Sequence, residues 1–416
     1  MAKNSPISTF GMRLVKAIIA AVVVVLCSRW LNADGRGVLS VTLFWLHMII
    51  LVHEMVGGSP IANLIRNKPI GSIVPAVWIW SILTGIFGGT MLFFFTNLPI
   101  FWILLIYFPL AWLGTHYNYY QGLSKVFIRN NLQVLLEVLK LLVLLVYYLL
   151  SPLITVVHVL VVYAITHILV YAISRWVLRP FFALAKQEMT KPPKILFSFG
   201  ITNQMAAILQ FLSYRIGVVL LANYVSDAEA GVFSNVLLIA DTVWIFANSF
   251  GTIAHMKILA SNNETYVARL VSKYVSISLM GTLLACFLIV LVPSSFYAFV
   301  FGADFGGMRA ISLAAIPGIL ALGFSTVMAH YLHAINRFNL LVLASLCGLS
   351  VQLICHYILL KELEGLGAGI ALSVGLVISA LILFIFTSKI LGKNLVFKPM
   401  YEFRLIKNMI KIMFYK

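Results

Sequence analysis

The chain has 416 residues, of which 62% are hydrophobic and only 10% are charged. Soluble domains carry about 25% charged residues, so this composition excludes a soluble protein and indicates an integral membrane protein. The formal net charge of +17 comes from basic residues between apolar stretches, where anionic lipid rather than nucleic acid is the expected counter-charge. No gap between the stretches is long enough for a soluble domain, which argues against enzymes with large extramembrane catalytic regions.

Twelve apolar stretches follow one another, each long enough to cross a hydrocarbon core of roughly 30 Å. They are expected at 10–31, 38–59, 72–95, 99–122, 131–150, 153–177, 195–223, 230–252, 270–300, 309–333, 338–360 and 365–391. Lys and Arg concentrate in every second gap, and the other gaps hold only Arg29, Arg36, Arg309 and Lys361. Because basic loops stay in the cytoplasm, both termini are expected on the cytoplasmic side.

An internal repeat divides the chain into two halves. Gly37-Val38-Leu39-Ser40 matches Gly231-Val232-Phe233-Ser234, and Gly122-Leu123-Ser124-Lys125 matches Ala334-Ile335-Asn336-Arg337. Two halves of six spans start on the same side of the membrane, which indicates a parallel duplication about an axis along the membrane normal. We therefore predict an all-α integral membrane protein with twelve transmembrane helices in two six-helix lobes related by a parallel repeat.

One polar, proline-containing segment lies near the middle of the chain, and Lys191-Pro192-Pro193-Lys194 closes it. We expect an N-terminal lobe at 1–178, a cytoplasmic linker at 179–194, a C-terminal lobe at 195–392 and a basic cytoplasmic tail at 393–416.

Polar residues inside the spans mark the expected site, since a charge at the bilayer centre costs a few kcal/mol and usually faces a bundle interior or a wet cavity. In the second span Ser40, His47 and Glu54 share one helix face, and in the eighth span Asp241 and Asn248 do so. Hydrogen bonding between helices is the alternative for the uncharged members. For Glu54 and Asp241 we favour a cavity.

Two basic residues, Lys140 and Arg215, stand well inside their apolar stretches rather than near an end. Lys140 follows Glu137 by three residues, so the two either neutralise each other across one turn or serve a site. Arg215, which shares a face with Gln204, has no acidic neighbour within its own turn. It needs Asp241 or another acid from a different helix, or an anionic substrate whose phosphate oxygens its planar fork binds in pairs.

Two histidine-containing runs have simple alternatives. His116 opens the run His116-Tyr117-Asn118-Tyr119-Tyr120-Gln121, whose aromatic and polar groups suit sugar binding, although tyrosines are also common at membrane interfaces. His53-Glu54-Met55-Val56-Gly57 begins like the zinc motif HExxH, but glycine stands where the second ligand must be. We therefore expect neither a metal site nor catalytic residues.

Several features together resemble the Wzx-type polysaccharide flippases of the multidrug/oligosaccharidyl-lipid/polysaccharide (MOP) exporter superfamily. They are the twelve spans in two parallel halves, Arg13 and Lys16 in the first span, Gly35-Arg36-Gly37, Ser213-Tyr214-Arg215-Ile216-Gly217 and Ala230-Gly231-Val232-Phe233-Ser234. The resemblance covers nearly the whole chain and implies the fold of MATE-type transporters. Many relatives carry an Asp shortly after the Arg of the seventh helix. This chain has Gly217 in that neighbourhood, and Asp241 is the candidate to serve instead.

The resemblance implies a multi-pass protein of the bacterial inner membrane. It would flip an undecaprenyl-pyrophosphate-linked oligosaccharide from the inner to the outer leaflet by alternating access, for O-antigen, capsule or exopolysaccharide synthesis. The residues expected to attract the pyrophosphate are Arg215, Lys140, Arg13 and Lys16. The residues expected to line the cavity are His47, Glu54, His116, Glu137, Gln204, Asp241 and Asn248.

No cofactor is expected, and coupling to H⁺ or Na⁺ through Glu54, Glu137 or Asp241 is a second hypothesis. The expected partners are the lipid-linked oligosaccharide, membrane lipids, and a polysaccharide polymerase and glycosyltransferases of the same pathway. The leading alternative is a MATE-like multidrug or cation antiporter, which would need an acidic cavity. A membrane ligase or polymerase ranks third because it would need a sizeable outer loop.

Overall fold

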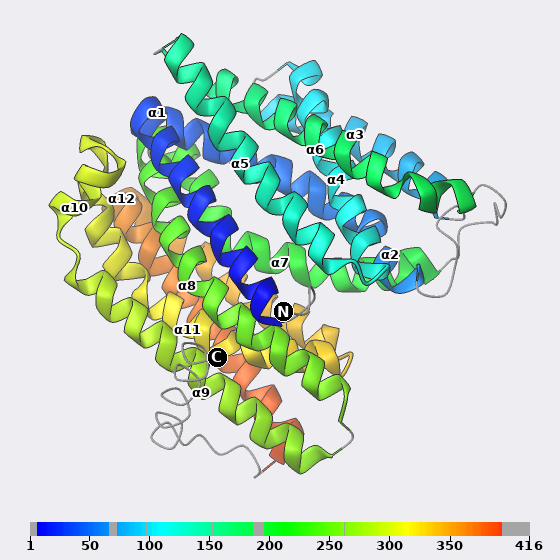
Figure 1. The fold of residues 1–416 in the computed structure, drawn as a ribbon. Coiled ribbons are helices and arrows are strands. Elements are labelled where there is room, and N and C mark those ends of the chain that lie inside the picture. The colour runs from blue at the N-terminus through cyan, green and yellow to red at the C-terminus, as the bar shows by residue number, and fades with distance from the viewer. Residues whose placement is uncertain are drawn as a thin grey trace, which may run out of the picture. The chain divides into compact units, whose positions relative to one another are not determined.

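The computed structural model describes residues 6–65, 73–96, 99–151, 153–185, 195–261 and 263–392. In these ranges every regular element is a helix (Figure 1). The α-helices are α1 Pro6–Gly57, α2 Ser59–Leu64, α3 Val74–Thr96, α4 Ile100–Gly122, α5 Val126–Leu150, α6 Val156–Ala185, α7 Ile195–Tyr224, α8 Asp227–Leu259, α9 Glu264–Leu291, α10 Ser294–Phe301, α11 Met308–Ala334 and α12 Phe338–Leu391, and a 3₁₀ helix, η2, covers Ala303–Gly307.

Two of these helices each contain two membrane spans. Helix α1 has 52 residues and α12 has 54, which at 1.5 Å per residue is about 80 Å, more than twice the hydrocarbon thickness. Each is broken at one residue with a positive φ, 56° at Asn32 and 47° at Glu364. Among the described residues ten helices are long and apolar enough to cross a membrane. Counting α1 and α12 twice gives the twelve spans that hydropathy predicts.

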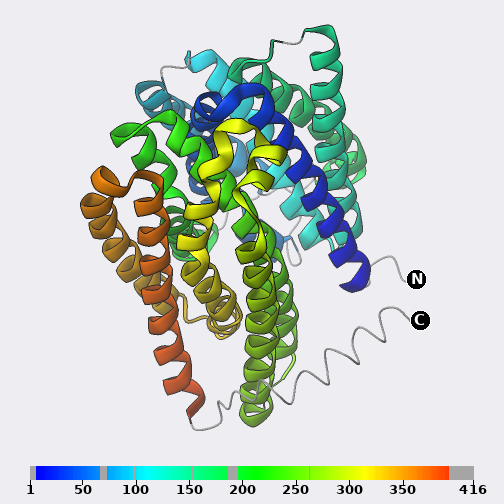
Figure 2. The same ribbon diagram turned by 90° about the vertical axis from the view of Figure 1, so that its left-hand side faces the viewer.

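The break in α12 turns the chain back on itself (Figure 2, orange to red). Ser379 after the break donates a hydrogen bond to the Ala344 carbonyl before it, at 3.1 Å. Gly348 lies so close to the second half that a Cβ built on it would stand 1.9 Å from Ser379 Oγ. The two halves of α12 are therefore a tightly packed antiparallel pair.

The ninth predicted span, 270–300, differs from the structure. It divides into α9, which ends at Leu291, and the short α10, which begins at Ser294. Between them Val292 and Pro293 are extended, with ψ values of 119° and 160°. The proline ring disfavours a helical conformation at the residue before it. The apolar run therefore continues past a break that hydropathy alone does not reveal.

The turns that follow α4 and α11 repeat each other, as the matched sequence segments predict. Ser124 and Asn336 have φ values of 58° and 57°. The Lys125 N–H donates to the Tyr120 carbonyl at 2.7 Å, and the Arg337 N–H donates to the Leu332 carbonyl at 2.9 Å. Both turns are Schellman caps, in which one left-handed residue satisfies the last carbonyls of a helix.

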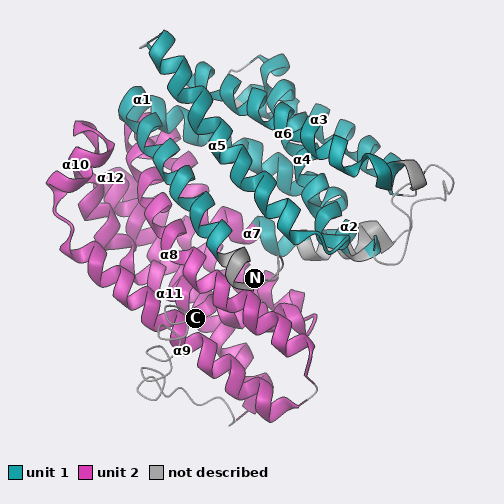
Figure 3. Ribbon diagram, in the orientation of Figure 1, with its two compact units in different colours: residues 1–208 teal, residues 209–416 magenta. Residues whose placement is uncertain are grey.

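The chain divides into two compact units, Met1–Ile208 and Leu209–Lys416 (Figure 3). The division falls inside α7, and residues 179–185 of the predicted linker continue α6. Residues 186–194 of that linker and the predicted tail at 393–416 lie outside the described residues. The lobe boundaries therefore stay a prediction.

Each unit has its own core. In unit 1 (Met1–Ile208), buried side chains of α1, α4, α5 and α6 pack together around Leu46, Tyr107 and Leu144. In unit 2 (Leu209–Lys416), α8 and α11 lie at the centre, and α11 is the more deeply buried. Close approach of small residues holds the centre of unit 2 together: the Gly318 N–H on α11 donates to Ser373 Oγ on α12 at 3.0 Å.

Candidate functional site

A group of basic side chains lies along the contact between α1 and α5 in unit 1. Arg13 and Lys16 are on α1, and Arg129 and Lys140 are on α5. Lys16 interacts electrostatically with the other three and with Glu137. Arg129 interacts with Arg13 and with Glu54. We call Arg13, Lys16, Arg129 and Lys140 the cation cluster. Arg13, Lys16 and Lys140 are three of the four residues that are expected from the sequence analysis to attract the pyrophosphate.

Lys140 is neutralised within its own helix. Its Nζ lies 2.7 Å from Glu137 Oε2, and both side chains are less than a tenth exposed. The ammonium also stands 4.7 Å from the centre of the Tyr163 ring, a cation–π contact. Glu137 and Lys140 therefore form the ion pair that their three-residue spacing allows. The positive excess of the cation cluster comes from Arg13, Lys16 and Arg129, whose acidic neighbours within the described part of the chain are Glu54 and the already paired Glu137.

Three buried donors near the cation cluster have no hydrogen-bond partner among the residues that the structure describes. They are Arg129 Nε, Asn130 Nδ2 and the Tyr117 hydroxyl. Arg129 uses another nitrogen, Nη1, to donate to Gln121 Oε1 at 2.5 Å. Each unpaired buried polar group costs about 1–3 kcal/mol, and such groups are normally satisfied by water or by a ligand. Unit 1 therefore contains a cationic, donor-rich region suited to an oxyanion.

Arg129 is the member of the cation cluster that sequence reasoning missed. It was placed in a basic cytoplasmic gap, because the fifth span was expected to begin at 131. Helix α5 begins at Val126 instead, so Arg129 lies one turn inside the helix. Arg129, Gln133 and Glu137 are spaced by four residues and therefore share one polar face of α5. This spacing is the sequence signal that identifies Arg129.

Glu54 forms a hydrogen bond with α7 in unit 1. Gln204 Nε2 donates to Glu54 Oε2 at 3.1 Å. This contact is possible because α7 passes very close to the end of α1: a Cβ added to Gly200 would stand 1.7 Å from the Met55 carbonyl oxygen. The structure thus brings together Glu54 and Gln204, two of the predicted cavity residues, at one helix crossing.

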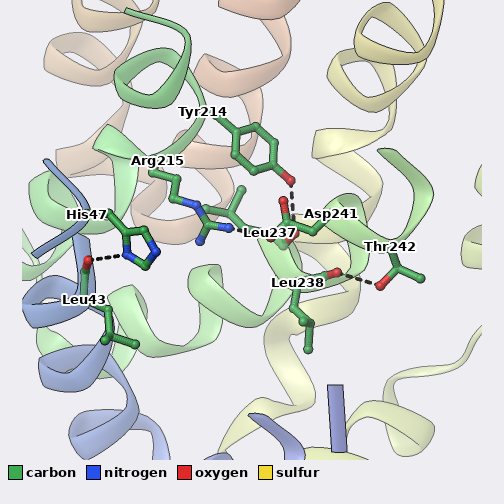
Figure 4. A network of polar contacts seen from close by, with 8 residues as sticks. All are labelled: Leu43, His47, Tyr214, Arg215, Leu237, Leu238, Asp241 and Thr242. Carbon is green, nitrogen blue, oxygen red and sulfur yellow. Dashed lines mark hydrogen bonds and ion pairs between the residues drawn. The ribbon is translucent and has the colours of Figure 1, made fainter. Parts of the chain in front are cut away.

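The two other predicted residues of unit 1 are histidines in different surroundings. His47 is exposed in α1, and its Nδ1–H donates to the Leu43 carbonyl at 2.8 Å (Figure 4). His116 is buried, with its Nδ1 2.9 Å from Ser174 Oγ, and its ring stacks on Tyr171. It lines a small cavity of about 40 Å³ that also contains Arg175 and Trp112. Whether either histidine contacts sugar stays a prediction.

In unit 2, Arg215 on α7 pairs with Asp241 on α8. Arg215 Nη2 lies 2.5 Å from Asp241 Oδ2, and each side chain is about one third exposed. Figure 4 shows the pair beside Tyr214, whose hydroxyl donates to the Leu237 carbonyl at 3.0 Å. The acid proposed from the sequence is therefore the partner of Arg215. Both side chains of the pair are partly exposed.

Gly217, the departure from the family pattern, has a packing reason. A Cβ there would stand 2.8 Å from the Phe233 ring and 3.2 Å from His356. An aspartate has no room at this position, and Asp241 supplies the carboxylate from the next helix.

Asn248 takes part in contacts between helices of unit 2. Its side-chain oxygen accepts a hydrogen bond from His330 Nε2 of α11 at 2.8 Å. His255 Nδ1 in turn donates to the His330 carbonyl at 3.0 Å. Asn248 therefore behaves as the structural alternative predicts. In the described residues, no group of three or more His, Cys, Asp or Glu residues is arranged to hold a metal ion.

Comparison with known proteins gives matches in structure only. No protein-family model matches the chain, and no curated protein matches it. An inward-facing multidrug resistance MATE family transporter of the MOP superfamily has a TM-score of 0.71 at 13% identity, with 91% of this chain and 95% of that one covered. A mutant of the Vibrio cholerae MATE transporter VcmN gives 0.68 at 14% identity, covering 94% and 98%.

The lipid II flippase MurJ in an inward closed conformation gives a TM-score of 0.66 at 12% identity, covering 91% of this chain and 87% of that one. These solved structures are transporters and a flippase, not enzymes. The chain is therefore a multi-pass helical membrane protein with the fold of the MOP-superfamily transporters.

Proposed function

We propose that the chain is a flippase that moves an undecaprenyl-pyrophosphate-linked oligosaccharide from the inner to the outer leaflet of the bacterial inner membrane. The observation that carries the proposal is the positive excess of the cation cluster, with unpaired donors beside it. Pyrophosphate offers several oxygens to such donors, and Arg binds them in pairs. Arg215 in unit 2 offers a second guanidinium, on a side chain that is about one third exposed.

The physical need for such a protein lies in the sugar. Each hydroxyl taken unpaired into hydrocarbon costs roughly 4–8 kcal/mol on a cyclohexane scale, so a short glycan meets a barrier of tens of kcal/mol. A polar region within the protein removes this barrier while the isoprenoid tail stays in lipid. Alternating access completes the cycle, in the service of O-antigen, capsule or exopolysaccharide synthesis, with glycosyltransferases and a polymerase of the pathway as partners.

The charge of unit 1 favours a flippase over a multidrug or cation antiporter. Only three acidic residues are described in this unit: Asp34, Glu54 and Glu137. Glu137 is paired with Lys140, and Glu54 accepts from Gln204. A cation would meet the cluster of like charge and be repelled. Ethidium efflux from cells that express the chain, abolished by Glu54→Gln, would instead support the antiporter.

The test of the proposal uses purified protein in vesicles that contain a labelled lipid-linked oligosaccharide. Arg129→Gln removes the arginine of the cation cluster on α5 and should lower the flipping rate at least tenfold, because a charged hydrogen bond is worth about 1.5–3 kcal/mol. Arg309→Gln is the matched control, since that exposed arginine lies at the start of α11 in unit 2 and is not a member of the cation cluster. Equal rates for both variants and the unchanged protein would contradict the assignment.

Arg215 and ion coupling are tested in the same vesicles. Arg215→Ala and Arg215→Glu should both impair flipping, the second more strongly because it places a second carboxylate beside Asp241. Normal flipping by both folded variants would remove Arg215 from the proposed site. Coupling to H⁺ or Na⁺ through Glu54, Glu137 or Asp241 predicts that collapsing the corresponding gradient slows transport, and unchanged rates would remove it.

A further inference from the structure

We propose that unit 1 carries a second binding site, for the phosphate headgroup of an anionic phospholipid, on the face of α6 near its C-terminal end. The proposal does not depend on the transport function. A groove of about 520 Å³, largely open to the surroundings, lies along this face, and all of its lining residues belong to α6: Ile168, Tyr171, Ala172, Arg175, Trp176 and Arg179.

The groove is cationic and has no acid among its lining residues. Arg175 and Arg179 are four residues apart, so they stand one above the other on α6, and both are exposed. Lys125 adds a third positive charge at this end of unit 1, with its Nζ 4.2 Å from the centre of the Phe181 ring. Two guanidinium groups at this spacing match the oxygens of one phosphate group.

A hydrogen-bond donor without a partner lies beside the groove. Tyr171 and Arg175 line both the groove and the small cavity of about 40 Å³ between α3, α4 and α6. Trp112 also lines that cavity, and its buried Nε1–H has no hydrogen-bond partner. The Arg175 guanidinium stands 4.1 Å from the Phe182 ring centre, and Arg175 lines both the groove and the cavity that Trp112 lines.

The length and polarity of the groove fit a phospholipid. From Arg179 to Ile168 the helix rises about 16 Å, from a charged end to an apolar one. Trp176 is 73% exposed and Ile168 is 41% exposed, so both present apolar surface to the surroundings. Basic gaps predict that this end of α6 is cytoplasmic, where anionic lipids attract Lys and Arg. The headgroup would bind the two arginines and an acyl chain would lie along Ile168 and Ala172.

Native mass spectrometry of the purified full chain, titrated with phosphatidylglycerol or phosphatidylcholine, tests the site. We expect phosphatidylglycerol to bind at least tenfold more tightly than phosphatidylcholine. The double variant Arg175→Gln, Arg179→Gln should lose about tenfold or more in affinity for phosphatidylglycerol. The matched control is Arg269→Gln with Lys273→Gln, a basic pair with the same spacing on α9, which should change it less than about twofold.

Further experiments distinguish a lipid phosphate from free inorganic phosphate and control for misfolding of the variants. Trp112→Phe keeps an aromatic side chain, although a smaller one, and removes the donor, and should weaken binding about threefold. Equal losses in the two double variants, or equal binding of both lipids, would overturn the proposal, as would displacement of phosphatidylglycerol by micromolar inorganic phosphate. If the Arg175→Gln, Arg179→Gln variant does not fold, the unchanged protein is crosslinked with photoreactive phosphatidylglycerol. Labelling of α6 at 168–179 supports the site, and labelling only elsewhere refutes it.

Discussion

Replacing Glu137 by Gln isolates the energetic role of the buried ion pair on α5. The two side chains are less than a tenth exposed and 2.7 Å apart, so the change leaves the Lys140 ammonium buried and in contact with the Tyr163 ring. Breaking one member of such a pair costs about 3–5 kcal/mol. The cation–π contact, worth about 0.5–2 kcal/mol, was present before and offsets none of this loss. The loss of stability has an upper limit of about 5 kcal/mol, because that is the free energy needed to deprotonate an ordinary lysine at pH 7 and so remove the buried charge.

The double variant Glu137→Gln, Lys140→Met provides the control. Replacing both members of a buried pair by uncharged groups of similar volume is often neutral or stabilising, so most of the lost stability should return. The free energy of unfolding of the full chain in bicelles, measured by steric trapping, distinguishes the three proteins. If Glu137→Gln alone is as stable as the unchanged protein, or if the double variant is no more stable than the single one, the pair is not the structural element described here.

Gly200→Ala should destabilise the chain by about 1–3 kcal/mol, because the new Cβ would meet the Met55 carbonyl oxygen. Gly114→Ala is the control, since a Cβ there has nothing within 4 Å, and it should leave the stability unchanged. Thermal unfolding in detergent compares the two variants. An equal melting temperature for both alanine variants would contradict the close crossing of α1 and α7. Ser124→Gly should stabilise the turn after α4 by about 1 kcal/mol because it relieves a positive φ. Asn336→Gly should gain less, since asparagine tolerates that conformation better, and the reverse order in melting temperature would refute the cap assignment.

The spans were predictable because their apolar content extends over whole helices, and the twelve expected stretches correspond to the observed helices except at Pro293. Helix ends were less predictable. Charged residues near the headgroups cost little, so a helix can continue into a basic stretch that hydropathy assigns to a loop. This is why α5 begins at Val126 rather than 131, and why Arg129 was missed.

Pairings inside one helix were predictable and those between helices were not, with one exception. Glu137 and Lys140 are three residues apart, and a helix brings residues at this spacing next to each other. The bond between Asn248 and His330 joins residues 82 positions apart, and no local pattern identifies it. Asp241 was named as the partner of Arg215 because an uncompensated cation in a membrane span demands an acid, and acids in this chain are few. Scarcity of candidates, rather than spacing, made that contact predictable.

The Schellman caps after α4 and α11 limit how either unit can move. Only three residues separate α4 from α5 and α11 from α12, and the cap bonds at Lys125 and Arg337 involve the last turn of the preceding helix. Sliding one helix past its neighbour by a single turn, about 5.4 Å, would break those bonds. Each helical hairpin must therefore move as a rigid body. Any rearrangement that opens a path through the protein requires changes in backbone torsion angles at other connections.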